Sequence, residues 1–447
     1  MTRLLSVVLL VMLGVTTAGA GEVRLSLREA IDMALEKNGR VRASGHAVEA
    51  ARQGVAVATS RLYPVLSFDE EFAVSNSPTR TFMMKLDEGK FTDNDFLIQN
   101  LNAPDTRHDF RTALTLRLPL YNPAVYPARE LAAGDLRLQD ARHSGIRQET
   151  AFRVFSRYLA VQKAGARLAV AEQAVSDARE HLRIAGVRTR SEVGLRSDEL
   201  RAKTHLAAAE QQLISARNNH TIASLELGSI IGLSDGQPAA LSEQLPAPQP
   251  IRQTVEELAA AALVNGSEAA VTRVEEEKAE AGIRLARAAY LPTVNAMTSY
   301  QMNSAHTPFG VDNDSWSAGV SLNWQLFDGF RRCREKERAR AEHAAASEQS
   351  EYVRRETALR VRESYLRSEE MARRLDVARN AVNDAEETVR LLGRRFENSL
   401  TTMVELLDAQ SALNQARADL VDSGADLALA RGHVYHAAGI FLKEMTR

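Results

Sequence analysis

Residues 315–327 read SWSAGVSLNWQLF, and apolar side chains take every second position of this stretch from its second residue. The apolar positions are Trp316, Ala318, Val320, Leu322, Trp324 and Leu326. Polar or small residues fill most of the alternate positions, so one side of the segment is apolar and the other is polar. A period of two is the signature of a β-strand, and about ten residues are enough to cross a bilayer at a tilt. The stretch therefore predicts an amphipathic strand.

Three other segments alternate in the same way, at about 65–75, 109–121 and 293–303. Their polar sides include the charged residues Asp69, Glu71, Arg111 and Arg117. A soluble sandwich and a membrane barrel both fit the periodicity, but charges facing one side suit a water-filled lumen and favour the barrel. Four strands cannot close, because the smallest membrane barrels have about eight and an open edge in lipid leaves backbone groups unpaired. Strands from several chains must therefore join.

Two long tracts without proline, 128–237 and 309–447, surround these strands in the sequence. Because a proline inside a helix costs about 3 kcal/mol, its absence permits long helices. Apolar residues recur there at steps of three and four, as in the series Ala202, Leu206, Ala209 and Leu213. We expect long coiled-coil-like helices at about 126–233 and 329–445. The predicted fold class is mainly α with a membrane β-barrel.

The chain repeats itself once. The tetrapeptides SLRE at 26–29 and TVEE at 254–257 both fit the capping box that begins a helix. Further along, residues match at a constant offset of 207, including Asp198 with Glu405, Leu200 with Leu407 and Ala202 with Ala409. Matches that keep a fixed offset and the helical phase indicate duplication. We expect two structural repeats, at 21–252 and 253–447.

The first twenty residues have the pattern of a signal peptide, with Arg3, an apolar run over 4–15 and the small residues Ala-Gly-Ala at 18–20. The mature chain is expected to begin at Gly21. The apolar run is shorter than the roughly 20 residues that cross a bilayer, and no later stretch is long and apolar enough. These features predict an exported chain without a transmembrane helix, destined for the periplasm, the outer membrane or the medium.

Composition excludes several other classes of protein. The 56 Lys and Arg residues balance the 58 Asp and Glu residues, so there is no basic excess to bind nucleic acid. Cys333 is the only cysteine, which excludes a disulfide framework and a cysteine-based metal centre. His433 and His436 have helical spacing but lack a third ligand, and buried helix histidines are the commoner interpretation. No nucleotide-binding or catalytic motif appears, so we predict neither an enzyme nor a cofactor.

These features together resemble the TolC family of outer-membrane efflux proteins. The resemblance rests on the signal peptide, the duplicated helix–strand–strand–helix–helix unit, Tyr-Pro at 63–64, Leu-Pro at 291–292, and the Asp/Glu-x-Leu-x-Ala pattern at 198–202 and 405–409. It covers essentially the whole mature chain. It implies a homotrimer in the outer membrane, with four strands per chain in one twelve-stranded barrel that continues as a long periplasmic helical barrel.

The resemblance also implies a set of functional residues. In this family a carboxylate pair narrows the periplasmic end of the tunnel, and Glu405 and Asp408 take those positions, with Asp198 in the matching place of the first repeat. A ring of carboxylates in a narrow pore favours cations, although ordinary solvated helix charges would give the same pattern. A lock formed by Tyr and Arg in some members cannot form here, because Phe396 and Thr401 replace them.

The turns between the long helices are the expected contact with a periplasmic adaptor. They are marked by Gly194 and Leu195 in the first repeat and by Ser399 and Leu400 in the second. Reversal of the chain alone would also explain them.

We therefore expect a passive outer-membrane exit duct of a tripartite efflux or type I secretion system. Its partners would be a periplasmic adaptor, an inner-membrane pump of the resistance–nodulation–division or ABC type, and outer-membrane lipid. The alternatives are a periplasmic coiled-coil adaptor and a secreted structural coiled-coil protein. The long insert at 75–109 is expected on the cell surface, because long loops of such barrels face outward.

Overall fold

The computed structural model describes residues 23–233, 236–245 and 249–445, and most of them are helical. The chain divides into two compact units, each built from both halves of the sequence. Unit 1 contains Met1–Arg42, Gly145–Gly266 and Thr357–Arg447, and unit 2 contains Ala43–Ser144 and Ser267–Glu356.

None of the helices in the described part of the chain is both long enough and apolar enough to cross a membrane.

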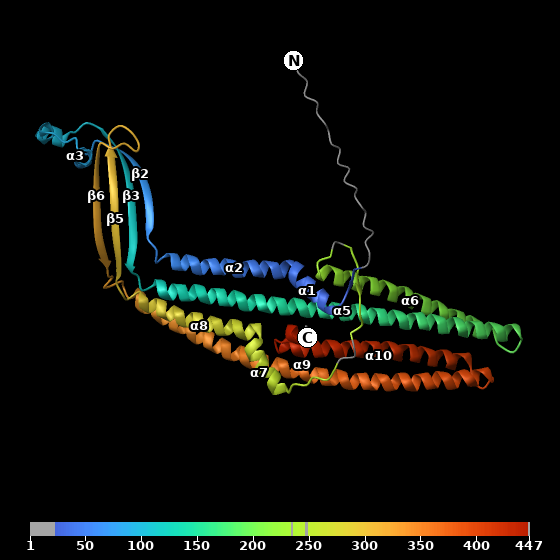
Figure 1. Cartoon of the computed structure of the whole chain (residues 1–447). Coiled ribbons are helices and arrows are strands. Elements are labelled where there is room, and N and C mark those ends of the chain that lie inside the picture. The colour runs from blue at the N-terminus through green and yellow to red at the C-terminus, as the bar shows by residue number, and fades with distance from the viewer. Residues whose placement is uncertain (1–22, 234–235, 246–248, 446–447) are drawn as a thin grey trace, which may run out of the picture. The chain divides into compact units, whose positions relative to one another are not determined.

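Unit 2 contains a four-stranded antiparallel sheet in the order β2-β3-β5-β6 (Figure 1). Its strands are β2 (Val65–Ser75), β3 (Arg107–Tyr121), β5 (Thr293–Ser304) and β6 (Asn313–Asn323). The prediction of four strands is confirmed. The predicted end of the last strand is wrong, because β6 ends at Asn323, opposite Thr293. Since β5 begins at Thr293, the following residues have no strand to pair with, and Trp324 instead donates to the carbonyl oxygen of Tyr290 at 3.1 Å.

The register of the sheet places the apolar sides of all four strands on one face. Phe68 lies opposite Leu114, Leu114 opposite Tyr300, and Tyr300 opposite Trp316. These four side chains stay between 43% and 77% exposed in the single chain. A row of exposed aromatic and aliphatic side chains across a whole sheet is unusual for a surface in water and suits contact with lipid.

The other face of the sheet is polar, and its side chains pair across the strands. Glu71 pairs with Arg111, and the hydroxyl groups of Thr115 and Ser299 are 3.1 Å apart. Neighbouring positions of this face carry Ser67, Asp69, Arg117, Asn295, Gln301, Ser317 and Ser321. One face thus suits lipid and the other suits water.

The insert between β2 and β3 is folded rather than extended. It contains α3 (Pro78–Asp87), the short 3₁₀ helix η1 (Asp93–Phe96) and α4 (Ile98–Asn102). Lys90 forms an ion pair with Asp312 at 2.6 Å, and Asn313 donates to the carbonyl oxygen of Asp87 at 3.1 Å. These bonds attach the insert to the turn between β5 and β6.

The remaining elements of unit 2 are α2 (Gly39–Ser60), α8 (Ser267–Ala288) and the ends nearest the sheet of α5 (Val125–Arg190) and α9 (Arg331–Glu397). Charged side chains join α5 to α8: Glu130 pairs with Arg284 at 2.9 Å, and Asp135 pairs with Lys278. Surface ion pairs of this kind contribute little stability each, so their main effect is to fix which helices are neighbours.

In its described residues, unit 1 contains the other ends of α5 and α9 together with five further helices. These are α1 (Leu27–Lys37), α6 (Arg196–Ile230), α7 (Val255–Asn265), α10 (Met403–Ala437) and α11 (Phe441–Met445). The two predicted capping boxes are confirmed. The side chains of Ser26 and Thr254 accept from the backbone N–H groups of Glu29 and Glu257, and the carboxylates of these glutamates accept from the backbone N–H groups of Ser26 and Thr254. The division of the sequence into two repeats, with a boundary at 252/253, stays a prediction.

Two strands of three residues each were not predicted. They are β1 (Val23–Leu25) and β4 (Ala239–Leu241), which pair in parallel within unit 1. The fully buried Tyr158 of α5 supports this pair, since its hydroxyl lies 3.3 Å from the carbonyl oxygen of Leu25 in β1 and 2.8 Å from that of Glu243, just after β4. Burial raises the pKa of Tyr158 to about 12, so the hydroxyl keeps its proton at any physiological pH.

Candidate functional site

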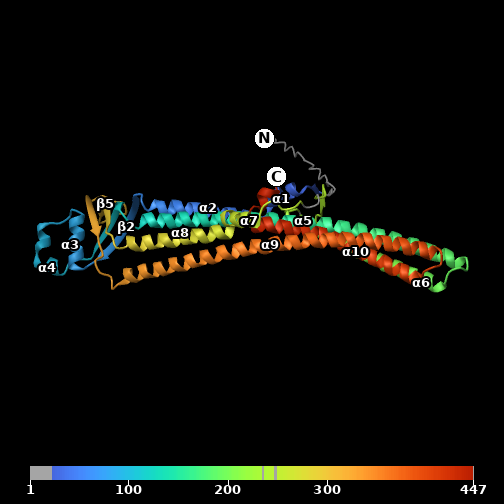
Figure 2. The same ribbon diagram turned by 90° about the horizontal axis from the view of Figure 1, so that it is seen from below.

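Two helix turns lie at the same end of unit 1, where α5 meets α6 and where α9 meets α10 (Figures 1 and 2). Each turn contains one residue with a left-handed backbone, Glu192 (φ 57°) in the first and Ser399 (φ 60°) in the second. Each is closed by a bond to the end of the preceding helix. Gly194 donates to the carbonyl oxygen of Arg188 at 2.9 Å, and Leu400 donates to that of Arg395 at 2.8 Å.

The four residues predicted to mark these turns all lie within them. The side chains of Leu195 and Leu400 are 67% and 66% exposed, so each turn presents one leucine to its surroundings. Gly194 is required by space rather than by φ, because a Cβ atom there would lie 2.9 Å from Cβ of Arg188. The turns therefore present two exposed leucines on a closely packed backbone.

Glu405 lies in the first turn of α10. The side chain of Thr402, the N-cap, accepts from the backbone N–H of Glu405 at 3.3 Å, and the hydroxyl of Thr401 donates to the carboxylate of Glu405. A carboxylate at this position also interacts favourably with the helix dipole. Glu405 therefore helps to begin the helix, whatever else it does.

Asp408 lies one turn further along α10 and is exposed. It lines a groove of about 440 Å³ between α6 and α10, together with His205 and Leu407. Asp198 lies in the first turn of α6, half-buried. Among the described residues, no hydrogen bond or ion pair joins Asp198 to Glu405 or Asp408. Within one chain, Glu405 and Asp408 therefore lie on the same helix, α10, whereas Asp198 lies on α6 and is bonded to neither.

The two turns are joined by Arg188, a residue that the sequence did not single out. Its guanidinium donates to the carbonyl oxygens of Phe396 and Glu397 at 3.1 and 3.2 Å and to the hydroxyl of Ser399 at 2.7 Å. The same group lies 4.9 Å from the centre of the Phe396 ring. A cation over an aromatic ring and three hydrogen bonds hold the end of α5 to the second turn.

A small apolar core lies directly behind the second turn. Its buried members are Ala185, Ala202, Phe396, Met403, Leu406 and Leu407, from α5, α6, α9 and α10. Phe396 has no hydroxyl group and so cannot form the lock that a tyrosine would form at this position. It is 6% exposed and belongs to this core. Phe396 therefore contributes packing here, and its carbonyl oxygen and ring are contacts of Arg188.

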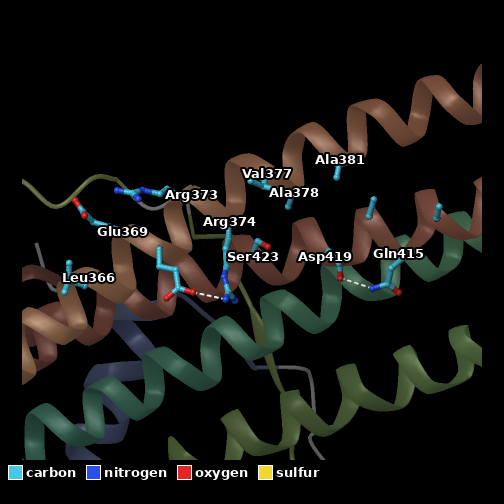
Figure 3. Close-up of a pocket in the computed structure, with 13 residues that line it drawn as sticks. Leu366, Glu369, Arg373, Arg374, Val377, Ala378, Ala381, Gln415, Asp419 and Ser423 are labelled. Carbon is cyan, nitrogen blue, oxygen red and sulfur yellow. Dashed lines mark hydrogen bonds and ion pairs between the residues drawn. The ribbon is translucent and has the colours of Figure 1, made fainter.

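A second groove runs between α9 and α10, with a volume of about 800 Å³ (Figure 3). Its walls are mostly apolar or small and include Leu366, Val377, Ala378 and Ala381, while charged residues surround the opening. Gln415 donates to Asp419 at 2.8 Å at its edge (Figure 3). Leu366 and Val377 are 64% and 69% exposed, so this part of α9 is an apolar surface without a partner in the single chain.

His433 and His436 pack against the ring of Phe152, with ring centres 4.5 and 4.7 Å apart. Burial lowers the pKa of both histidines, which favours their neutral form. Within residues 23–233, 236–245 and 249–445, no group of three His, Cys, Asp or Glu side chains could hold a metal ion. The pair therefore belongs to the aromatic core of unit 1.

The outer membrane efflux protein family matches residues 30–233 and 258–439, which is most of the chain. Several solved structures have the same fold. VceC of Vibrio cholerae is 16% identical with a TM-score of 0.76, over 92% of this chain and 96% of that one. CmeC of Campylobacter jejuni is 14% identical with a TM-score of 0.77, over 94% and 89% of the two chains. No match was found among the curated proteins.

The chain belongs to the outer membrane efflux protein family. Its fold is TolC-like, with long helices and a four-stranded antiparallel sheet. As a member of this family it is a protein of the outer membrane and not an enzyme.

Proposed function

We propose that three copies of this chain form the passive exit duct of a tripartite efflux system or a type I secretion system. The observation that carries the proposal is the sheet of unit 2. Its outer strands, β2 and β6, each pair on one side only among the described residues. An unpaired strand edge costs several kcal/mol per backbone group in hydrocarbon, and joining the sheets of three chains edge to edge removes every such edge.

The exposed apolar residues of the long helices support the same assembly. On α6 these are Leu200, Ile214 and Ile222, and on α9 they are Leu359, Leu366, Val377 and Leu391. They recur along each helix, so that a second copy packed against these helices would bury them. Contact between α6 of one copy and α9 of the next would close a ring of helices.

The helix turns support a role in binding a periplasmic adaptor and in selecting ions. Leu195 and Leu400 are exposed at the tip and would be buried by the turn of a periplasmic adaptor. Glu405 and Asp408 from three copies would bring six carboxylates to one constriction, which would favour cations. The energy for transport would come from an inner-membrane pump of the resistance–nodulation–division or ABC type.

Membership of the family favours the duct over a periplasmic coiled-coil adaptor or a secreted coiled-coil protein. The two-faced sheet points the same way, since its face of exposed aromatic residues has a use in lipid and none in water.

The first test is the mass of the full chain in mild detergent, together with its conductance in planar bilayers. We expect a trimer that forms stable pores. Ile214→Asn should weaken the trimer, because Ile214 is 69% exposed in the single chain and would be buried between copies. Gln212→Asn, an exposed position on the same helix, is the matched control. A folded monomer with its full strand content would overturn the proposal.

A further inference from the structure

Two histidines join three helices near the tip of unit 1. His181 of α5 lies 3.4 Å from Oε1 of Gln410, measured from its Nε2 atom, and Nε2 of His205 of α6 lies 3.3 Å from the hydroxyl of Ser411. Gln410 and Ser411 are consecutive residues of α10. Two adjacent positions on α10 thus receive one histidine from each of the two neighbouring helices.

The hydrogen bonds determine which nitrogen atom of each histidine carries the proton. The hydroxyl of Ser411 already donates to the carbonyl oxygen of Leu407 at 2.9 Å, so it accepts from Nε2 of His205. The amide nitrogen of Gln410 donates to Asp177 at 3.1 Å, so its oxygen is free to accept from His181. Both histidines then donate through Nε2, and in the neutral form their Nδ1 atoms carry no proton.

The Nδ1 atom of His205 is buried and has no hydrogen-bond partner. Adding a proton there would place a positive charge and an unsatisfied donor in a buried position, which is unfavourable. The ionisable groups around His205 are His181 on α5, Arg201 on α6 and Asp408 on α10. Asp177 on α5 accepts from Gln410, the partner of His181. Arg417 on α10 pairs with Asp177 at 3.7 Å, which offsets the charge of that carboxylate.

We propose that His205, with His181 as its neighbour on α5, forms a proton-sensitive joint, which holds α6 against α10 at neutral pH and releases it in an acidic medium. This inference rests on the proposed function, since the release would widen the periplasmic end of the duct. The groove between α6 and α10 already contains His205 and Asp408, so separation of the two helices would act on the predicted gate directly.

Burial of His205 determines whether acid strengthens or weakens the packing of α6 against α10. Burial, and then the neighbouring His181, lower the pKa of His205 below its ordinary value. A histidine with a lowered pKa binds protons less well in the packed state than in the open state, so the packing is stable above about pH 6.5 and weakens as the pH falls below it. For one proton, the ratio of open to closed forms rises at most about tenfold per pH unit.

The test measures access to the interface of α6 with α10. Ala202 is fully buried against this interface, one helical turn before His205, so Ala202→Cys provides a thiol that reacts only when the helices separate. The exposed Cys333 is an internal reference, because the reagent reaches it without any separation of the helices. In the full chain we expect the ratio of the two rates to be constant from pH 8 to 7 and to rise between pH 6 and 5.

His205→Gln should abolish the rise, because glutamine can still donate to Ser411 but does not titrate. His181→Gln should reduce it, because the pKa of His205 is then less depressed. His46→Gln, at an exposed histidine of α2, should leave it unchanged. A ratio that stays flat in the unsubstituted background, or that rises equally in His205→Gln, would overturn the joint.

Hydrogen exchange of residues 199–210 in the unaltered chain, corrected for intrinsic rates, gives the same answer if Ala202→Cys fails to fold. Conductance separates this inference from the proposed function. A chain that forms no pore at any pH contradicts the duct but leaves the thiol result valid. Pores whose conductance does not change between pH 8 and 5, in a chain whose thiol ratio does, would overturn the link between the joint and the gate.

Discussion

The two helix turns have the same backbone shape but are held in different ways. In the second turn, Thr402 caps α10 with its side chain, and the adjoining Phe396 and Met403 are buried. In the first turn, Leu195 is the N-cap of α6 and makes no side-chain bond, and its side chain is exposed. The second turn is therefore fixed by its own cap, by its buried neighbours and by the bonds that it accepts from Arg188. The first turn has only its backbone bonds and no side-chain cap.

This difference indicates where the tip can move. A helix end without a cap frays more easily than a capped one, because its first N–H groups lack partners. We therefore expect α6 to be the mobile helix of the tip and α10 to be the fixed one. The three predictions below test this asymmetry.

The largest effect is expected from Arg188→Met. The change removes three hydrogen bonds and the contact with the ring of Phe396, and a hydrogen bond from a charged group contributes about 2 kcal/mol. Loss of about 2 kcal/mol would speed hydrogen exchange in the second turn, at residues 398–402, by roughly 30-fold. Hydrogen exchange followed by mass spectrometry measures this directly.

Arg190→Met is the control for Arg188→Met, since Arg190 is an exposed arginine in the same last turn of α5. It should change exchange at 398–402 by less than about twofold, within the range of ordinary surface substitutions. Equal effects of the two changes would mean that Arg188 acts by charge alone and does not join the turns.

Smaller effects on helix stability, of opposite sign, are expected from substitutions at the two N-caps. Thr402→Ala should destabilise the start of α10 by about 1 kcal/mol, because a capping side chain is lost. Leu195→Ser should stabilise the start of α6 by a similar amount, because the backbone of Leu195 already has the extended conformation of a cap (φ −83°, ψ 142°). Exchange rates of the first turns of α10 and α6 report both, and a Leu195→Ser variant with unchanged exchange would contradict the asymmetry.

The smallest effect on folding is expected from Glu405→Gln combined with Asp408→Asn. Both side chains are exposed, so stability should change by less than about 1 kcal/mol. The preference of the pore for cations, measured as the reversal potential across a salt gradient, should nevertheless fall. Asp198→Asn should change the reversal potential less, because Asp198 lies on the other, uncapped helix. Unchanged selectivity in the double variant would mean that Glu405 and Asp408 are ordinary helix charges.

The alternation of side chains made the two faces of the sheet predictable, because a period of two depends only on neighbouring residues. The register was not predictable, and the register is what aligns Phe68, Leu114, Tyr300 and Trp316 in one row. The strand that ends at Asn323 was predicted too long for the same reason. Its apolar pattern continues past the point where its partner strand begins.

The site was predictable where its residues act locally. The turns were located from Gly194 and Ser399, and the Thr-x-x-Glu pattern at 402–405 is a capping signal that would also have located the cap of α10. Arg188 and the two histidines of the joint were not predictable. Their partners lie on helices more than 200 residues away in the sequence, and no local pattern records such a contact.

The pairing of β1 with β4 limits the order in which this chain can fold. Val23 lies at the beginning of the described chain, and its partner Ala239 follows only after α5 and α6 have been made. A contact between such distant residues forms late, because a long loop must close first. The residues of β1 are thus among the last of unit 1 to find their place, although they precede α5 and α6 in the chain. Until then, Leu25, Leu27 and Ile31 remain exposed apolar residues that a chaperone would have to shield.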